Sequence, residues 1–171
     1  MVSVVSIILI SHFLATLLCT LVAGILLCFS IVVMPGIKAL DAREYLQSFK
    51  VMDQVIQNNQ PIFMFVWLGS TIALITLAWF GLQHFEGVWR VLILIVCGLH
   101  FLGVQLPTIK INIPLNNYLQ KTELLGLSDG ALVEIRSNFE ARWNQSNVIR
   151  TACAITSAIL LLALMILPSL E

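Results

Sequence analysis

The sequence contains few charged side chains for its length. Of its 171 residues, 11% are Asp, Glu, Lys or Arg and 59% are hydrophobic. An ordinary soluble domain carries roughly 25% charged residues, because polar groups must cover its surface. Nine basic and nine acidic residues balance each other, so the cationic excess typical of nucleic-acid-binding proteins is missing. The composition excludes a soluble globular domain, a disordered chain and a nucleic-acid-binding module, and it indicates a single membrane domain over residues 1–171.

Charge is completely absent from four windows of the chain. These windows are residues 1–37, 54–85, 91–109 and 151–170. A helix needs about 20 mostly apolar residues to cross a bilayer, so each window holds one span. The spans should be helices, because backbone polar groups in lipid must pair within their own segment. We predict an all-α, integral membrane four-helix bundle, with spans at about residues 4–33, 62–82, 88–109 and 147–167.

The sequence also lacks the features of a cleaved signal peptide and of a disulfide framework. No basic residue precedes Lys38, so we expect the first apolar window to remain as a span. The four cysteines lie inside predicted spans and form no CxxC pair. We therefore expect packing residues, with no disulfide and no metal site, at Cys19, Cys28, Cys97 and Cys153.

Residues 39–58 predict an amphipathic helix on the membrane surface or against the bundle. Its predicted apolar face carries Tyr45, Phe49, Met52 and Ile56, which recur at i, i+4, i+7 and i+11. The polar residues of the segment, Asp53 among them, are assigned to the other faces.

Three further signals define where helices begin and end. Met34-Pro35-Gly36 is expected to end the first span, and residues 112–117 are expected to form an irregular turn after the third span. Ser128 is the expected N-cap of a long helix that continues from Asp129 into the fourth span.

The distribution of Lys and Arg predicts the orientation. Eight of the nine lie in the links 34–60 and 110–150, and only Arg90 lies elsewhere. The positive-inside rule then places both links in the cytoplasm and both termini on the opposite side of a plasma or inner membrane.

Two histidines, His12 and His100, lie inside predicted spans. An ionisable residue at that depth suggests a functional site, although a neutral histidine bonded to a neighbouring hydroxyl is equally consistent with the sequence. The two could be axial ligands of a haem, but their predicted depths differ by about 6 Å and no other residue supports haem. We expect no cofactor and keep haem bound by His12 and His100 as the alternative.

Five polar and aromatic residues should meet at the link end of the bundle. Asn112 and Asn116 follow the third span, while Trp143, Asn147 and Arg150 recur at i, i+4 and i+7 on the last helix. Arg150 either faces inward and bonds the 112–116 turn, which we favour, or extends to lipid headgroups.

This combination resembles the anthrone-oxygenase-like family of small membrane proteins. The resemblance rests on the NIPLN turn at 112–116 together with RWNQSNVIRT at 142–151, within a four-span chain whose first span ends in a Gly–Pro segment, Gly24 to Pro35. Fungal members are associated with the oxidation of anthrones to anthraquinones by molecular oxygen, without an established cofactor. Many other members have no assigned activity.

The resemblance implies a membrane oxidoreductase of the cofactor-independent oxygenase type, acting on an apolar, aromatic substrate. His100 is then the candidate catalytic base. The candidate substrate-binding residues, most of them donors to an enolate, are Asn112, Asn116, Trp143, Asn147 and Arg150. A distance of about 15 Å along the helix between the depths of His100 and Arg150 counts against both touching one small substrate.

The alternative function is non-catalytic. The chain would then be a membrane module that binds haem, an apolar ligand or a protein partner, and the Asn/Arg cluster would only join the links to the bundle. In both cases the expected partners are the lipid bilayer and an apolar small molecule. The sequence leaves open whether the chain forms a homo-oligomer.

Overall fold

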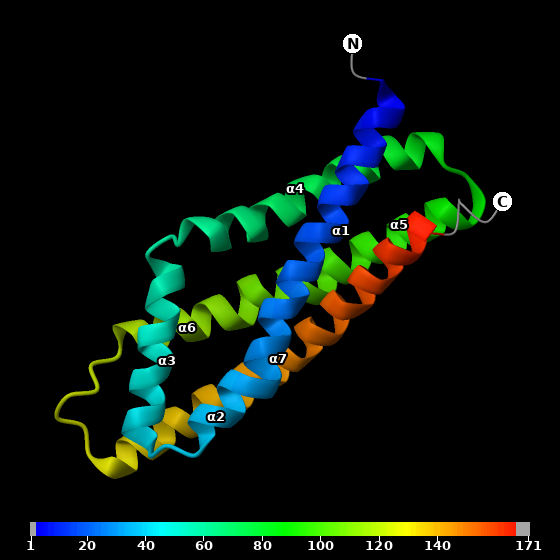
Figure 1. The fold of residues 1–171 in the computed structure, drawn as a ribbon. Coiled ribbons are helices and arrows are strands. Elements are labelled where there is room, and N and C mark those ends of the chain that lie inside the picture. The colour runs from blue at the N-terminus through cyan, green and yellow to red at the C-terminus, as the bar shows by residue number, and fades with distance from the viewer. Residues whose placement is uncertain (1–2, 167–171) are drawn as a thin grey trace.

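Four long helices form an antiparallel bundle in the computed structural model, which describes residues 3–166 (Figure 1). Each is long and apolar enough to cross a membrane, and their bounds are Val4–Lys38, Pro61–His84, Gly87–Lys121 and Asp129–Ile166. The described residues contain no strand. The chain is an all-α integral membrane protein, as the four charge-free windows predict.

Two of the four spans, the first and the third, are divided into shorter helical segments. The first span consists of α1 (Val4–Cys28), a π-helical segment (Phe29–Val33) and α2 (Met34–Lys38). The second span is α4 (Pro61–His84), and the fourth is α7 (Asp129–Ile166). The third span begins as α5 (Gly87–Gly98), passes through π-helical segments at Leu99–Gln105 and Thr108–Asn112, and ends as α6 (Ile113–Lys121). Outside the bundle core, α3 (Ala42–Gln57) crosses the link end.

The first span continues through Pro35 and the third span through Pro114, contrary to the sequence prediction. The first helix does not end at Met34-Pro35-Gly36, and residues 112–117 are helical instead of forming an irregular turn. Each π-helical segment ends two residues before a proline, namely Pro35, Pro107 and Pro114. A proline ring crowds the carbonyl four residues earlier, and the wider π turn gives it room, so the helix continues.

Helix α3 buries Tyr45 and Phe49 as predicted, but its buried face is rotated from the predicted one. It begins at a capping box, in which the Asp41 carboxylate accepts from the Glu44 N–H at 2.8 Å. Its buried residues are Tyr45, Leu46, Phe49 and Asp53. Met52 and Ile56, which the sequence analysis placed on the apolar face, are only partly buried. The prediction assigned Asp53 to a solvated face because local periodicity does not register its partners on other helices.

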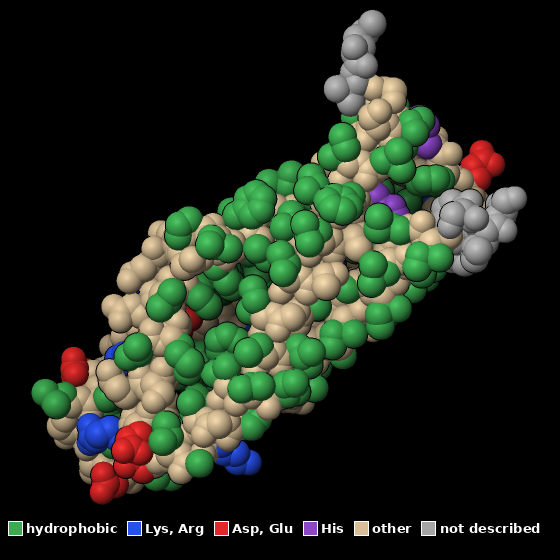
Figure 2. Space-filling view, in the orientation of Figure 1, with side chains coloured by type: hydrophobic (Ala, Val, Ile, Leu, Met, Phe, Trp, Pro, Cys, Tyr) green, Lys and Arg blue, Asp and Glu red, His purple; other side chains and the backbone are tan. Residues whose placement is uncertain are grey.

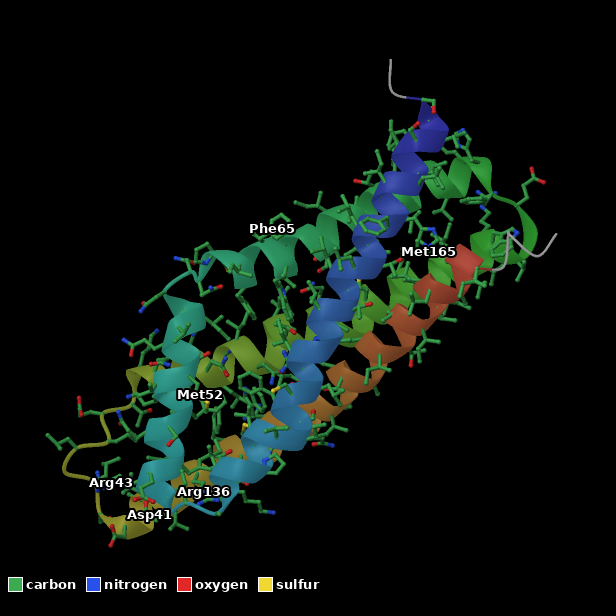
Figure 3. The ribbon with its side chains drawn as sticks, in the orientation of Figure 1. Asp41, Arg43, Met52, Phe65, Arg136 and Met165 are labelled. Carbon is green, nitrogen blue, oxygen red and sulfur yellow. The ribbon has the colours of Figure 1, made fainter. Side chains whose placement is uncertain are left out.

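Backbone carbonyls of the links are satisfied by arginines. The Arg43 guanidinium donates to the carbonyls of Leu124 and Leu127 at 2.6 and 2.9 Å. Arg136 on α7 likewise donates to the carbonyls of Lys38, the last residue of α2, and Leu40. Both arginines lie at the α3 end of the molecule (Figure 3). Ser128 caps α7 as predicted, since its hydroxyl accepts from the Ala131 N–H at 3.4 Å.

The two ends of the bundle differ in polarity. Helix α1 begins and α7 ends at one end, while the α2–α3 and α6–α7 connections lie at the other (Figure 1). Hydrophobic side chains cover the length of the bundle, and most visible Lys, Arg, Asp and Glu side chains gather at the α3 end (Figure 2). Both long links therefore lie at the same end of the bundle.

Candidate functional site

A cavity of about 340 Å³ lies at the link end of the bundle, between α1, α3, the start of α4, the α6 end of the third span, and α7. Its size is at the lower end of the range for small-molecule sites. Figure 2 shows this face hollowed between α1 and the α3–α4 corner. Most of the wall is apolar, with the aromatic residues Phe29, Phe49, Phe63, Trp67 and Trp143.

All five substrate-binding residues predicted from the sequence line this cavity. The Trp143 indole N–H donates to Asn116 Oδ1 at 2.8 Å, and the Asn112 amide contacts the Trp143 carbonyl at 3.5 Å. Arg150 Nη2 donates to Asn147 Oδ1 at 2.9 Å, and its Cζ lies 5.7 Å from the centroid of the Trp143 ring. The five residues form one connected group, whose role in substrate binding remains a prediction.

Arg150 faces inward and is 4% exposed. Its bonding differs from the prediction, because Nη1 donates to the Thr108 hydroxyl at 3.0 Å instead of to carbonyls of the 112–116 segment. Those residues are helical. Most of their carbonyls therefore accept from their own helix, and no exposed turn is available to the guanidinium.

Asp53 is the site residue that sequence reasoning missed. It lines the cavity and is 4% exposed. Its carboxylate accepts from the side-chain amides of Asn116 at 2.7 Å, Gln120 at 2.9 Å and Gln57 at 3.2 Å. The i+4 spacing of Tyr45, Phe49 and Asp53 is the sequence signal that could have placed this carboxylate on the buried face.

His100 lies outside the cavity and belongs to a neighbouring polar network. Trp67, which does line the cavity, donates its indole N–H to Gln105 Oε1 at 3.1 Å. This bond fixes the orientation of the Gln105 amide, whose Nε2 lies 3.2 Å from His100 Nε2 and 2.9 Å from the Thr71 hydroxyl. His100 Nε2 therefore accepts, and the proton is on Nδ1, which lies 3.8 Å from the Cys19 sulfur.

The two intramembrane histidines do not face each other. His12 Nε2 lies 2.9 Å from the Leu161 carbonyl, which accepts its proton. His100 contacts Cys19 on α1, seven residues beyond His12, or about 10 Å along the helix axis. With both rings engaged by separate partners, the structure does not bring them together as a pair of axial ligands.

Among the described residues, no group of three or more His, Cys, Asp or Glu side chains is arranged to hold a metal ion. The described part of the chain has one ion pair, between Arg136 and Glu140 at 2.9 Å. The charged groups of the cavity, Asp53 and Arg150, are thus not paired with each other.

Comparisons with known proteins place the chain in a family. Neither a search of curated proteins nor a search of solved structures finds a match. The sequence model described as anthrone oxygenase matches residues 52–160, which is more than half of the chain. The matched segment contains Asp53 and all five predicted substrate-binding residues. The chain belongs to the anthrone oxygenase family.

Proposed function

We propose that this protein is a membrane oxidoreductase that oxidises an apolar, aromatic ketone of the anthrone type with molecular oxygen. The observation that carries the proposal is that a carboxylate and a guanidinium line one aromatic cavity without forming an ion pair with each other. Asp53 and Arg150 lie at the two ends of a chain of contacts that runs from Asp53 through Asn116 and Trp143 to Arg150. A base and an oxyanion-binding group are thus available to one flat ligand.

The chemistry of an anthrone fits this pair. The carbonyl and the methylene group of an anthrone occupy opposite positions of the central ring, so loss of a methylene proton places negative charge on the carbonyl oxygen. The resulting enolate donates electrons to O₂. Overall, a CH₂ group and O₂ become C=O and water, so no external reductant is required.

Asp53 is proposed as the base. A carboxylate has about four acceptor positions, and amide groups occupy three of them, which leaves one for a substrate proton. Arg150 and Asn147 are proposed to stabilise the developing oxyanion. The aromatic side chains of the cavity wall are proposed to pack against the rings of the substrate. The sequence-based choice of His100 as base stays a prediction, but its position outside the cavity favours Asp53.

Entry from the bilayer is consistent with the surface beside the cavity. An apolar groove between α1 and α4 carries Leu14 and Leu68, and it shares Met64 with the cavity wall. Phe65 lines the same groove on the outer face of α4 and is 66% exposed (Figure 3). An apolar substrate dissolved in the membrane would reach the cavity along this groove.

Oxygen uptake by purified protein in lipid nanodiscs tests the proposal. With anthrone in air-saturated buffer, we expect O₂ consumption above that of empty nanodiscs and formation of anthraquinone. With ¹⁸O₂, one labelled atom should enter the new carbonyl group. A rate equal to that of empty nanodiscs, despite binding of anthraquinone, would support the non-catalytic ligand-binding function instead.

Two variants distinguish the candidate bases. Asp53→Asn should lower the rate above background by about 10²-fold or more, because the proton acceptor is lost. His100→Asn should retain most of the rate. The reverse ranking, in variants that still bind anthraquinone, would assign the proton transfer to His100.

A further inference from the structure

Arg150 carries a buried positive charge without a negative partner. The side chain is 4% exposed, and its two hydrogen-bond acceptors are a threonine hydroxyl and an asparagine amide oxygen, both neutral. Removing a charge from water is costly unless an opposite charge or a full set of hydrogen bonds replaces the solvent. The protein groups around Arg150 therefore leave part of this cost uncompensated.

The guanidinium also has unused donor capacity. Its Nε–H is buried and has no hydrogen-bond partner among the described residues. An arginine offers five N–H donors in a planar fork, and this geometry matches an anionic oxygen. The residue lines the cavity wall, so the guanidinium borders the space in which a ligand would lie.

Asp53 does not supply the missing charge. It is the other charged residue in the cavity wall, and its oxygens are engaged by Asn116, Gln120 and Gln57. A ligand anion would be repelled by Asp53 and attracted by Arg150. The two charges therefore favour a single orientation of an anionic ligand. Its negative oxygen lies at Arg150, and its C–H groups point toward Asp53.

We infer that this cavity binds its ligand as an oxyanion, and that the ligand class is the aromatic phenol or enol whose acidic oxygen loses its proton on binding to Arg150. Phe49, Trp67 and Trp143 in the wall select a flat ring system. The inference deepens the proposed function, because it narrows the substrates to aromatic ketones with an ionisable oxygen.

The direct test is the ionisation of a bound dye that cannot be turned over. 2-Hydroxyanthraquinone changes colour when its phenol ionises, so its apparent pKa can be read from visible absorption. The titration is run with wild-type protein in nanodiscs and with empty nanodiscs. Bound to the protein, the dye should ionise at a pH lower by about one to three units, as expected for an acid next to a buried cation.

Four variants assign the shift to Arg150. Arg150→Met removes the charge at similar length and should abolish the shift, while Arg150→Lys should retain part of it. Arg142→Met, at an exposed arginine on the same helix, should retain it fully. Asp53→Asn removes a negative charge and should leave the shift intact or increase it.

Anthraquinone, which has no ionisable group, reports the integrity of the cavity. Continued binding of anthraquinone to Arg150→Met shows that the cavity is intact in this variant. If Arg150→Met fails to fold, the wild-type shift and its partial retention in Arg150→Lys still decide the question. No binding of the dye, an unshifted wild-type titration, or a full shift in Arg150→Met would overturn the inference.

The dye titration and the oxygen-uptake assay distinguish failure of the oxyanion site from failure of the proposed function. A shifted dye pKa without O₂ uptake on anthrone leaves the oxyanion site standing and removes the oxidase activity. O₂ uptake without a shifted dye pKa leaves the activity standing and removes the oxyanion site.

Discussion

Tyr45 on α3 shows how burial alters the chemistry of one side chain. Its ring is fully buried, its hydroxyl has no hydrogen-bond partner among the described residues, and the Arg136 guanidinium lies 4.3 Å from the ring centroid. Burial raises the pKa of Tyr45 above its ordinary value of 10.0, Glu140 raises it further, and Arg136 opposes them. The folded protein therefore keeps a proton that the unfolded chain releases at alkaline pH.

This raised pKa predicts an alkaline loss of stability. The contribution of Tyr45 to the free energy of unfolding is complete below pH 10 and is lost as the pH rises above that value. Above pH 10 the Tyr45 hydroxyl ionises more readily in the unfolded chain than in the folded protein. Tyr45→Phe should reduce this loss and leave stability near pH 7 almost unchanged, since the hydroxyl has no bond to lose. Unfolding in detergent at pH 8 and pH 11 measures both effects. Tyr118→Phe, at a tyrosine that is 53% exposed, is the control, and an equal effect there would contradict the assignment.

Gly103 is the glycine at which two spans approach most closely. A Cβ at this position would lie 2.5 Å from the sulfur of Cys153 on α7 and 2.7 Å from its Cβ. Gly103→Ala should therefore destabilise the bundle by about 1–3 kcal/mol through overpacking. Gly98→Ala, five residues earlier on the same span, meets no atom within 4 Å and should be neutral or slightly stabilising. Thermal unfolding of the two variants side by side is the measurement, and equal midpoints would show that the helices can separate without cost.

At the scale of elements, α3 depends on its cap for the position of Asp53. The Asp41 carboxylate accepts from the Glu44 N–H, and Asp53 lies three turns further along the same helix. Asp41→Ala should destabilise the first turn of α3 by about 1 kcal/mol, whereas Asp41→Asn keeps an acceptor and should cost little. Hydrogen exchange of the α3 amides reports the local change. Equal protection in both variants would mean that packing alone holds the helix.

The elements also show where local sequence signals are reliable. Ser128 and the 38-residue helix α7 were predictable, because capping and helical spacing act within a few residues. The continuation of the first span through Pro35 and of the third span through Pro114 was not, since a proline usually ends a helix. The π-helical turns before these prolines are stabilised by neighbouring helices, and tertiary contacts of this kind leave no local pattern.

At the scale of the whole molecule, two spans separate the two long links, so both links should lie on one membrane face. We expect a cysteine at Leu125, which is 84% exposed in the link before α7, to react with an impermeant maleimide from one side. A cysteine at Glu86, in the connection between α4 and α5, should react from the other side. The excess of Lys and Arg in the long links predicts that Leu125→Cys is labelled from the cytoplasm. Labelling of both positions from the same side would contradict the four-span topology.

The membrane class and the four spans could be predicted from the amino-acid sequence alone, as could the group formed by Asn112, Asn116, Trp143, Asn147 and Arg150. A bilayer excludes charge and sets the length of a span, and residues three or four apart on one helix share a face, so these features can be read locally. The folded structure was needed to show that Asp53 belongs to the cavity, that His100 does not line it, and that Arg150 donates to Thr108. These outcomes depend on how the helices are rotated against one another, and that rotation follows from the packing of side chains that are distant in the sequence.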